Sequence, residues 1–388
     1  MPKQKTIINA EKALKKTELC LTAKMKIQPD KSAKAALLRT MRTYRNACNH
    51  ISNVAFKHQM TKAFSLHRYL YGTVREKYGM GAQMTQSTFR TVSAACRAQK
   101  TKNNWTRAVK FHYPHAVWLH QRDYSVTDGS VKLRTLNGWV NVPLVIQGHE
   151  EYFDDIWKWG AARIKMYGGV WFLEVAITRN VSTLPVSSTP TVVGVDVGLN
   201  FLLTTYDSEG NTQFFHGRAV KHRRQRYFNL RRTLSRKGTK SAQRRLGAIG
   251  RRERRWMQDV NHRISKTLVC SYPPGTVFVL EDLKGLNAKS RKSGRYYALT
   301  AWAYADLREK IEYKAMQHGS RTITVPPEYT SQTCPKCGYQ SQDNRNRKKH
   351  EFKCRQCGYT TNDDRAAAMN LCKLGEETIR AVRAGHDS

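Results

Sequence analysis

The sequence predicts a multidomain α+β protein, in which a β-domain split by a helical insert precedes a second α+β domain with a small metal-binding module. Strand-like and helix-like periodicities occupy separate blocks of the 388 residues. The stretch VSTLPVSSTPT, Val181 to Thr191, has two prolines and no apolar periodicity, which is typical of a linker. Two Cys-x-x-Cys pairs near the end of the chain indicate the metal-binding module.

The net charge restricts the kind of partner. The chain has 68 Lys and Arg against 29 Asp and Glu, a formal charge of +39. This surplus favours RNA or DNA, because neutralising phosphates releases counterions; an acidic membrane is the weaker alternative. No apolar run approaches the ~20 residues that span a bilayer, and the opening MPKQKTIINAEKALKK lacks the apolar core of a signal peptide. We expect a soluble, cytoplasmic, nucleoid-associated protein.

The first 180 residues alternate between strand and helix patterns. Apolar alternation predicts a strand over 19–27, ended by Pro29-Asp30, and apolar residues every three or four positions then predict helices from Leu37 to Ala55 and after Thr85. Strands resume near Trp105. Tight turns are predicted at Asp128-Gly129, Asn137-Gly138 and Gly168-Gly169. We assign 1–30 and 105–180 to the β-domain, 31–104 to the helical insert, and 181–191 to the linker.

After the linker the patterns predict a three-strand meander, helices, and further strands. The strands are expected at Val192 to Val197, Phe201 to Tyr206, near Phe214, Val277 to Leu280 and Arg321 to Val325. Sixteen Lys or Arg and one acid, Glu253, lie between Arg218 and Arg255, with leucines at helical spacing, which predicts a basic helical hairpin interrupted at Gly238. Further helices are expected from about Thr300 to His318 and from about Asp363.

The four cysteines near the end of the chain have the spacing of one zinc site. Cys334-x2-Cys337 and Cys354-x2-Cys357 are separated by sixteen residues. Disulfides and a chance coincidence are the alternatives, but neither explains the glycine that follows each pair and lets the backbone fold round thiolates. Four cysteine ligands leave no open coordination position, so we expect a structural zinc ion, and catalysis must depend on other residues.

Three acids stand where predicted strands end or a helix begins: Asp196, Glu281 and Asp364. The element order is that of an RNase H-like domain, whose first and fourth strands are neighbours, so the carboxylates would meet. Converging carboxylates repel one another unless cations lie between them, and Mg²⁺ prefers oxygen ligands. Two ions ~3.5–4 Å apart, with Asp196 as shared ligand, would support phosphodiester hydrolysis.

Neighbouring acids require a choice at two of these positions. Glu281 and Asp282 face opposite ways on a strand, and we choose Glu281 because it ends the apolar run. Of Asn362, Asp363 and Asp364 we choose Asp364, because Ala367, Ala368 and Leu371 follow it at helical spacing, which leaves Asp363 as a helix cap. Each acid taken singly is more often a cap or a strand end than a catalytic residue.

With these motifs in view, the chain resembles the TnpB family of RNA-guided nucleases of insertion sequences. The family's GxDxG, IxxEdL, TSQxCxxCG and DxNAAxN motifs occur here in that order, at Gly194 to Gly198, Val277 to Leu283, Thr330 to Gly338, and Asp364 to Asn370. The last motif departs from the family, with Ala366 in place of Asn and Asp363 where Arg is common.

The resemblance implies a split β-barrel wedge domain with a helical recognition insert, then a RuvC nuclease domain (192–328, with its final helix in 361–388) interrupted by the zinc ribbon (329–360). It implies that an omega RNA supplies the guide, and that the protein, most simply a monomer, reads a short motif beside a double-stranded DNA target.

Candidate contacts to the nucleic-acid backbone are Arg223, Arg224, Arg231, Arg232, Arg244 and Arg245, because this run has few acids to pair with. Gln86 and Arg90 are candidates for reading the adjacent motif. A guide-directed repressor without cleavage and an RNase H-like transposase remain the alternatives.

Overall fold

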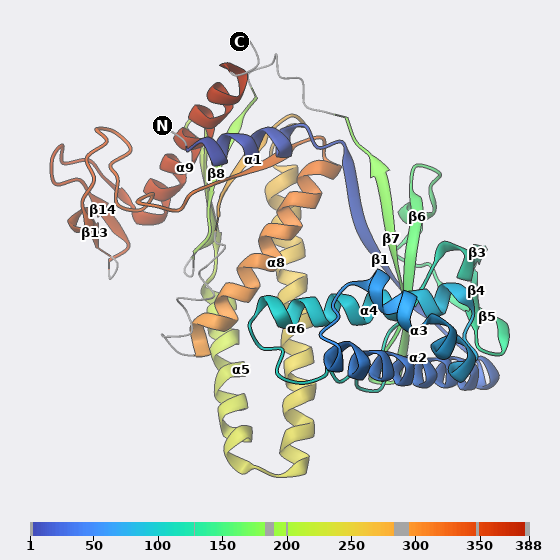
Figure 1. Ribbon diagram of the computed structural model, residues 1–388. Helices are drawn as coiled ribbons and strands as arrows, with labels where there is room; N and C mark the ends of the chain where they lie inside the picture. Colours follow the sequence, from blue (N-terminus) through green and yellow to red (C-terminus); the bar gives the residue numbers. More distant parts are fainter. Residues whose placement is uncertain are drawn as a thin grey trace. The chain divides into compact units, whose positions relative to one another are not determined.

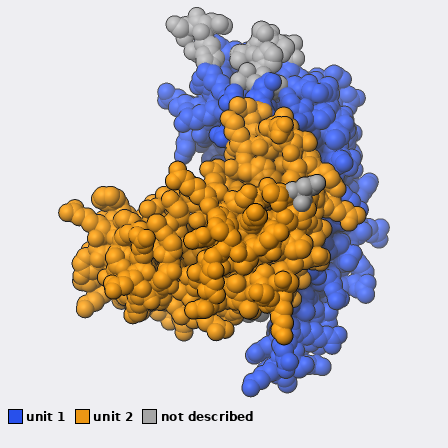
Figure 2. All heavy atoms as spheres, turned by 90° about the vertical axis from the view of Figure 1, so that its right-hand side faces the viewer, with its two compact units in different colours: residues 1–19, 181–388 blue, residues 20–180 orange. Residues whose placement is uncertain are grey.

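The computed structural model describes residues 3–127, 129–182, 190–198, 201–282, 295–346 and 349–384, with side chains from 304 onward in the helix that begins at 295. The chain forms two compact units, residues 20–180 and residues 1–19 with 181–388 (Figure 2). Most of the predicted linker, 183–189, lies outside the described residues, as do Asp128 of one predicted turn and Leu283 of one family motif. None of the described helices is both long and apolar enough to cross a membrane.

The unit of residues 20–180 contains a seven-stranded sheet of order β2-β6-β7-β1-β5-β4-β3 (Figure 1). Its strands are β1 (Glu18–Ile27), β2 (Val117–Leu119), β3 (Tyr124–Thr127), β4 (Ser130–Thr135), β5 (Gly138–Val145), β6 (Lys158–Tyr167) and β7 (Val170–Asn180). The Tyr124 hydroxyl of β3 donates to the Gly160 carbonyl of β6 at 2.6 Å, so the two ends of the sheet approach each other. The sheet is therefore nearly closed, as a barrel is.

The predicted turns differ in their outcome. Tyr167 pairs with Val170 across Gly168 and Gly169, which both have positive φ, so that turn is confirmed. Thr135 pairs with Gly138, so the second turn consists of Leu136 and Asn137, and Gly138 already begins β5. The prediction placed this turn one residue too late.

The helical insert has three long helices, one more than the sequence predicted. They are α2 (Lys31–Lys57), α3 (Ala63–Tyr78) and α4 (Ala82–Thr101). Asp30 caps α2 by accepting from the Ala33 amide at 2.7 Å, and the predicted apolar face of α2 is buried. Helix α3 was missed, and it ends at Gly79, whose φ of 59° suits a left-handed C-cap.

The second unit is built on a five-stranded sheet of order β10-β9-β8-β11-β12. Its strands are β8 (Val192–Asp196), β9 (Phe201–Asp207), β10 (Thr212–His216), β11 (Val277–Glu281) and β12 (Arg321–Val325). Strands β8 and β11 are parallel neighbours, with Val195 opposite Leu280. The predicted adjacency of the first and fourth strands is therefore confirmed.

Helices cover both faces of this sheet. Val192, Val277 and Val279 pack in one apolar cluster with residues of α9 (Asp363–Ala384). Their neighbours in the strands, among them Val193 and Leu280, pack in another cluster with residues of α6 (Lys240–Cys270) and α8 (Arg295–Gln317). Because side chains alternate along a strand, positions 194, 196 and 281 face α9.

Helix α9 crosses strand β8 at very short range. A Cβ atom on Gly194 would collide with the backbone of α9 at Ala368 and Cys372. The Cys372 thiol donates to the Val192 carbonyl at 3.3 Å at the same crossing. Gly194 therefore lets the helix that carries Asp364 lie directly on the strand that carries Asp196.

The N-terminal helix corrects the predicted domain assignment. The sequence analysis placed residues 1–30 in the β-domain, but α1 (Gln4–Leu14) packs on β12 and α9 of the second unit, with Ala10 buried among Ile323 and Ile379. Ile7, Ala10, Ala13 and Leu14 recur at helical spacing and pack in this cluster, but periodicity cannot show which sheet a helix packs on. Only the strand that follows belongs to the seven-stranded sheet.

The basic segment forms the predicted helical hairpin. Helix α5 (Arg218–Lys237) ends at Gly238 in the left-handed conformation, and Thr239 caps α6 by accepting from the Ala242 amide at 3.1 Å. Leu234 and Ile249 are buried between the two helices. The arginines lie outside this narrow apolar seam.

The cysteine segment forms a small sheet before α9. Strands β13 (Arg345–Asn346), β14 (Glu351–Lys353) and β15 (Thr360–Asn362) pair in antiparallel fashion. Phe352 is buried between the cysteines and Ala366 of α9. This packing ties the cysteine module to the start of the helix that carries Asp364.

Candidate functional site

Two of the three predicted acids lie at the ends of adjacent parallel strands. Asp196 ends β8 and Glu281 ends β11, one residue beyond the Val195–Leu280 pair. Both carboxylates face the α9 side, because they are in phase with Val192 and Val279. The structure therefore brings Asp196 and Glu281 together.

The third acid enters from the first turn of α9. Asp364 is 7% exposed, and its Oδ2 atom would be 3.4 Å from a Cβ atom on Gly198, which follows β8. The same Cβ atom would be 2.7 Å from the Phe201 carbonyl, so glycine is needed here too. The glycines on either side of Asp196 thus allow α9 and Asp364 to approach it.

The helix cap is Asn362, which corrects the role expected for Asp363. The Asn362 side-chain oxygen accepts from the amides of Asp364 and Arg365, at 3.0 and 3.1 Å. Asp363 is instead 1% exposed and paired with Arg345, whose Nε lies 2.8 Å from its Oδ2. Spacing alone could not identify the arginine partner, which is distant in sequence and half-buried.

Asp282, the residue directly after β11, points elsewhere. Asp282 forms an ion pair with Arg308 of α8 at 3.7 Å, while Glu281 accepts a hydrogen bond from the Thr330 hydroxyl at 2.7 Å. Alternation along the strand separates the two acids, as the sequence analysis expected. Glu281 is the one that lies with Asp196.

The surroundings of the three carboxyl groups favour their protonated, uncharged forms. Burial raises the pKa of Asp196 well above its ordinary value, and the charges of Glu281 and Asp364 raise it further. Burial also raises the pKa of Glu281 and of Asp364, while Arg345 lowers both. Three acids held in this state are suited to bind cations, which lower the cost of ionising them.

The donor chemistry of these acids fits Mg²⁺, which prefers oxygen ligands. Among the described residues, one group of three or more His, Cys, Asp or Glu side chains has all its ligand atoms within 4.8 Å of one another, and this group is the four cysteines. The oxygens of the three carboxylates are therefore farther apart than that. Mg²⁺ keeps several waters and takes few protein carboxylates, and two-metal sites extend over several ångströms. The carboxylates can therefore hold divalent ions without being in mutual contact.

Arg345 is a member of this site that the sequence analysis missed. It lies in β13, and its Nη2 atom is 3.7 Å from Asp364 Oδ1. The preceding residue, Asn344, is 1% exposed and donates to the carbonyls of Gln332 and Tyr339, which fixes the start of the strand. An arginine between two cysteine pairs gave no pattern that could reveal this placement.

The four predicted cysteine ligands converge. The Sγ atoms of Cys334 and Cys357, and those of Cys337 and Cys354, are 3.6 Å apart. A tetrahedron of thiolates ~2.3 Å from a zinc ion has edges of about 3.8 Å, so the donor set fits the metal. Gly338 and Gly358 have φ of 77° and 72° and donate to the carbonyls of Cys334 and Cys354, which gives both turns the same geometry.

The predicted arginines of the basic hairpin differ in their surroundings. Arg232, Arg244 and Arg245 are exposed. Arg231 forms an ion pair with Glu253, and the guanidinium of Arg223 lies 4.5 Å from the ring centroid of Trp256. Arg224 is half-buried. The expectation that this run lacks acidic partners is therefore wrong for Arg231.

Gln86 and Arg90 line one pocket in the unit of residues 20–180. The pocket has a volume of about 280 Å³ and also includes Trp118 and His120. Gln86 is half-buried and Arg90 is exposed, both on α4. The two residues thus line one pocket together with the aromatic side chain of Trp118.

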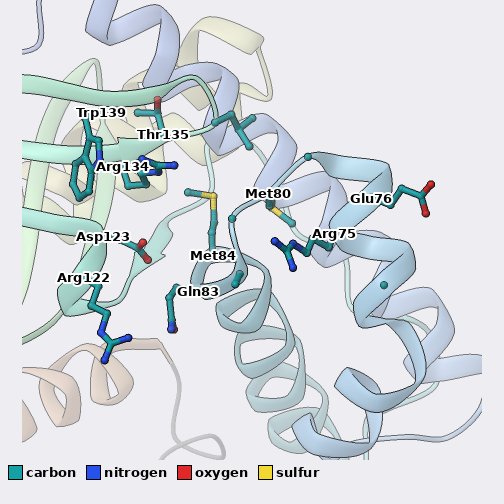
Figure 3. A pocket seen from close by; sticks show the side chains of 15 residues that line it. Arg75, Glu76, Met80, Gln83, Met84, Arg122, Asp123, Arg134, Thr135 and Trp139 are labelled. Carbon is teal, nitrogen blue, oxygen red and sulfur yellow. The ribbon is translucent and has the colours of Figure 1, made fainter.

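The same unit contains a larger cleft that the sequence analysis did not predict (Figure 3). It has a volume of about 910 Å³ and lies between the α3–α4 junction and the strands β4 and β5. Arg75, Arg122 and Arg134 line it, and Arg134 lies 5.5 Å from the ring centroid of Trp139. Its cationic and aromatic lining is assembled from three distant segments, which explains why no local pattern revealed it.

Two parts of the chain match known protein families. Residues 174–290 match the OrfB_IS605 family, described as a probable transposase, and residues 304–371 match the Cas12f1-like TNB domain. These segments include Asp196, Glu281, Asp364 and the four cysteines.

Relatives extend the match over most of the chain. The putative RNA-guided DNA endonuclease InsQ of Escherichia coli (strain K12) is 25% identical over 373 residues, which cover 87% of this chain and 89% of InsQ. The TnpB-like protein MJ1635 of Methanocaldococcus jannaschii is 31% identical over 150 residues, 38% of this chain and 34% of that protein.

A solved structure shares the fold. It is the protein chain of a cryo-EM structure of a Cas12f1–sgRNA–target DNA complex, with a TM-score of 0.62 at 16% identity, covering 87% of this chain and 82% of that one. The fold is a Cas12f-like α+β fold. The sequence matches support classifying the chain with the TnpB family.

Proposed function

We propose that this protein is an RNA-guided DNA endonuclease that cuts its target by Mg²⁺-dependent phosphodiester hydrolysis in a RuvC-like site. The observation that carries the proposal is the convergence of Asp196, Glu281 and Asp364 on the α9 side of adjacent strands, in a chain that matches InsQ over most of its length. A protein that only bound DNA would have no need of three mutually repelling carboxylates, two half-buried and one buried.

Asp196, Glu281 and Asp364 would hold the divalent ions, with Asp196 as the shared ligand. Bound Mg²⁺ would supply a nucleophilic water and stabilise the leaving 3′ oxygen. The chain's own part is to fix the three carboxylates and to keep Arg345 beside Asp364, where its guanidinium can contact a non-bridging phosphate oxygen. Hydrolysis is the reaction that this arrangement serves best.

The four cysteines would hold a structural zinc ion. All four coordination positions are taken by thiolates, so the ion would stabilise the ribbon rather than take part in the reaction. The ribbon positions Arg345 and packs on Ala366 of α9. Zinc would thus support the catalytic residues indirectly.

Replacing a zinc ligand is expected to destabilise the ribbon. Cys354→Ser should remove the zinc and cost about 3 kcal/mol or more of local stability, because structural zinc contributes directly to folding. Metal analysis and thermal melts check both effects, with Cys270→Ser as control because Cys270 is an exposed thiol outside the ribbon. A Cys354→Ser protein that melts normally without zinc would contradict the structural role.

The proposed partners are a guide RNA and a double-stranded DNA target. We propose that the seven-stranded sheet acts as the wedge domain, that residues 31–104 act as a recognition insert, with Gln86 and Arg90 reading the target-adjacent motif, and that 192–328 with 361–388 form the RuvC-like domain. The exposed arginines of the α5–α6 hairpin would contact the nucleic-acid backbone, because guide pairing leaves the protein to read shape and charge.

The α5–α6 hairpin offers a direct test of RNA binding. The double variant Arg244→Glu, Arg245→Glu should weaken RNA binding by about 10-fold or more and flatten the salt dependence by about one unit of slope for each lost phosphate contact. The control Lys12→Glu, Lys16→Glu changes net charge equally at two exposed lysines, one in the last turn of α1 and one just after the helix. Equal weakening in the two variants would mean that total charge, and not the hairpin, determines binding.

The function is tested with the RNA that copurifies with the protein. That RNA is sequenced, and the complex is incubated with Mg²⁺ and a plasmid library in which a matched target follows random sequence. We expect cuts beside one short motif. Binding without cuts at any motif would favour a guide-directed repressor, and strand joining by the protein alone would favour a transposase.

A further inference from the structure

The loop from Tyr329 to Thr333 joins strand β12 to the first cysteine turn and also reaches Glu281. The Thr330 hydroxyl lies 2.7 Å from Glu281 Oε1 but 3.4 Å from the Pro327 carbonyl. A hydroxyl has one hydrogen to donate, and the carboxylate is both the closer and the stronger acceptor. Thr330 is 4% exposed, so bulk water does not compete freely for this bond.

Asn370 of α9 holds the same loop from behind. Its Nδ2 atom donates to the Thr330 carbonyl at 2.7 Å and to the Thr333 carbonyl at 2.8 Å, which uses both of its hydrogens. Asn370 is 7% exposed, and Tyr329, at the start of the loop, has a φ of 66° and accepts from the Gln332 and Thr333 amides. The carbonyls of Tyr329, Thr330 and Thr333 thus all accept hydrogen bonds, which fixes the conformation of the loop.

Helix α9 consequently fixes the positions of two of the three carboxylates. It carries Asp364 in its first turn, and through Asn370 and Thr330 it also fixes the side chain of Glu281. Thr330 engages Oε1 and leaves Oε2 for another ligand. A glutamate has three side-chain torsions, so a fixed oxygen removes much of the freedom that metal binding would otherwise have to restrict.

We propose that Thr330 and Asn370 are positioning residues that preorganise Glu281 for divalent-metal binding. This inference rests on the proposed function, because it takes Glu281 to be a metal ligand. The competing interpretation is that Asn370 and Thr330 only anchor the turn before Cys334 and have no effect on Glu281. The two interpretations differ in what happens when the hydroxyl alone is removed.

The test compares Thr330→Val, which keeps the shape and removes the hydroxyl, with Thr330→Ser, which keeps the hydroxyl. Mn²⁺ binding to the RNA-bound protein without DNA is measured by electron paramagnetic resonance, and single-turnover cleavage is measured across a Mg²⁺ titration. We expect Thr330→Val to weaken Mn²⁺ binding and slow cleavage by about 10–100-fold, with partial recovery at high Mg²⁺. Thr330→Ser should stay within about 3-fold of the wild type.

Asn370→Asp provides a second variant in case Thr330→Val does not fold, because a carboxylate cannot donate to the two carbonyls. It should show the same loss of Mn²⁺ affinity. Wild-type Mn²⁺ affinity in Thr330→Val, or equal loss in Thr330→Ser, would overturn the positioning role. If the wild type binds Mn²⁺ but does not cut DNA, the proposed function fails, and the Mn²⁺ comparison still decides the role of Thr330.

Discussion

Asp196→Ala is expected to abolish guided DNA cleavage and leave RNA binding unchanged. Asp196 would be the ligand shared by both ions, and removing the charge stabilisation that such ions give the transition state costs several kcal/mol. A loss of about 4 kcal/mol slows cleavage by roughly 10³-fold. Cleavage is followed on a matched duplex, and RNA binding by filter retention.

Asp282→Ala is the matched control for this prediction. Asp282 is also an acid at the end of a central strand, but it pairs with Arg308 on the other side of the sheet. Its replacement should leave the cleavage rate within a few-fold of the wild type. Undiminished cutting by Asp196→Ala, or equal loss in Asp282→Ala, would refute the assignment of the metal ligands.

The same site makes a prediction about stability and pH. The pKa of Asp196 is raised by burial and by its acidic neighbours, so the folded, metal-free protein holds this proton more tightly than the unfolded chain does. The stabilisation from protonation is complete below the ordinary pKa and is lost as pH rises through the raised value. Asp196→Asn should therefore melt about 2–4 °C higher than the metal-free wild type at neutral pH. This shift corresponds to a gain of roughly 1 kcal/mol in the free energy of unfolding. The difference should vanish in acid.

Gly194→Ala is expected to disrupt both folding and cleavage. The added methyl group would collide with the backbone of α9 at Ala368 and Cys372, and backbone cannot move aside as a flexible side chain can. We expect a loss of about 3 kcal/mol or more in the stability of this unit. Any displacement of α9 would also carry Asp364 away from Asp196.

Gly250→Ala is the control, because a Cβ atom at position 250 of α6 has nothing within 4 Å. Alanine in a helix interior is favoured over glycine by up to ~1 kcal/mol, so this variant should be neutral or slightly more stable. Thermal melts and cleavage rates distinguish the two. A Gly194→Ala protein with normal stability and rate would show that α9 does not pack on β8 as described.

The sequence predicted those parts of the site that follow from periodicity and element order. Val192 and Val277 begin apolar runs that end in acids, so the adjacency of β8 and β11 was enough to bring Asp196 and Glu281 together. The alanines after Asp364 correctly predicted which face of the last helix is buried. The cysteine spacing predicted the ribbon, because its ligands are local in sequence.

Features that depend on distant contacts could not be predicted. Arg345 reaches Asp363 and Asp364 only after the ribbon has folded against α9, and Asp363 therefore looked like a cap. The cleft near Trp139 is assembled from a helix junction and two strands. Arg231 finds its acidic partner, Glu253, across the helical hairpin, and charge counting along the chain gave no indication of that pairing.

The most direct test of the central claim is an anomalous-difference map from crystals of the RNA-bound protein grown with Mn²⁺. Our account predicts Mn²⁺ coordinated by Asp196 together with Glu281 and Asp364, with Thr330 still bonded to Glu281. Mn²⁺ bound elsewhere, while these three carboxylates carry no metal, would contradict it.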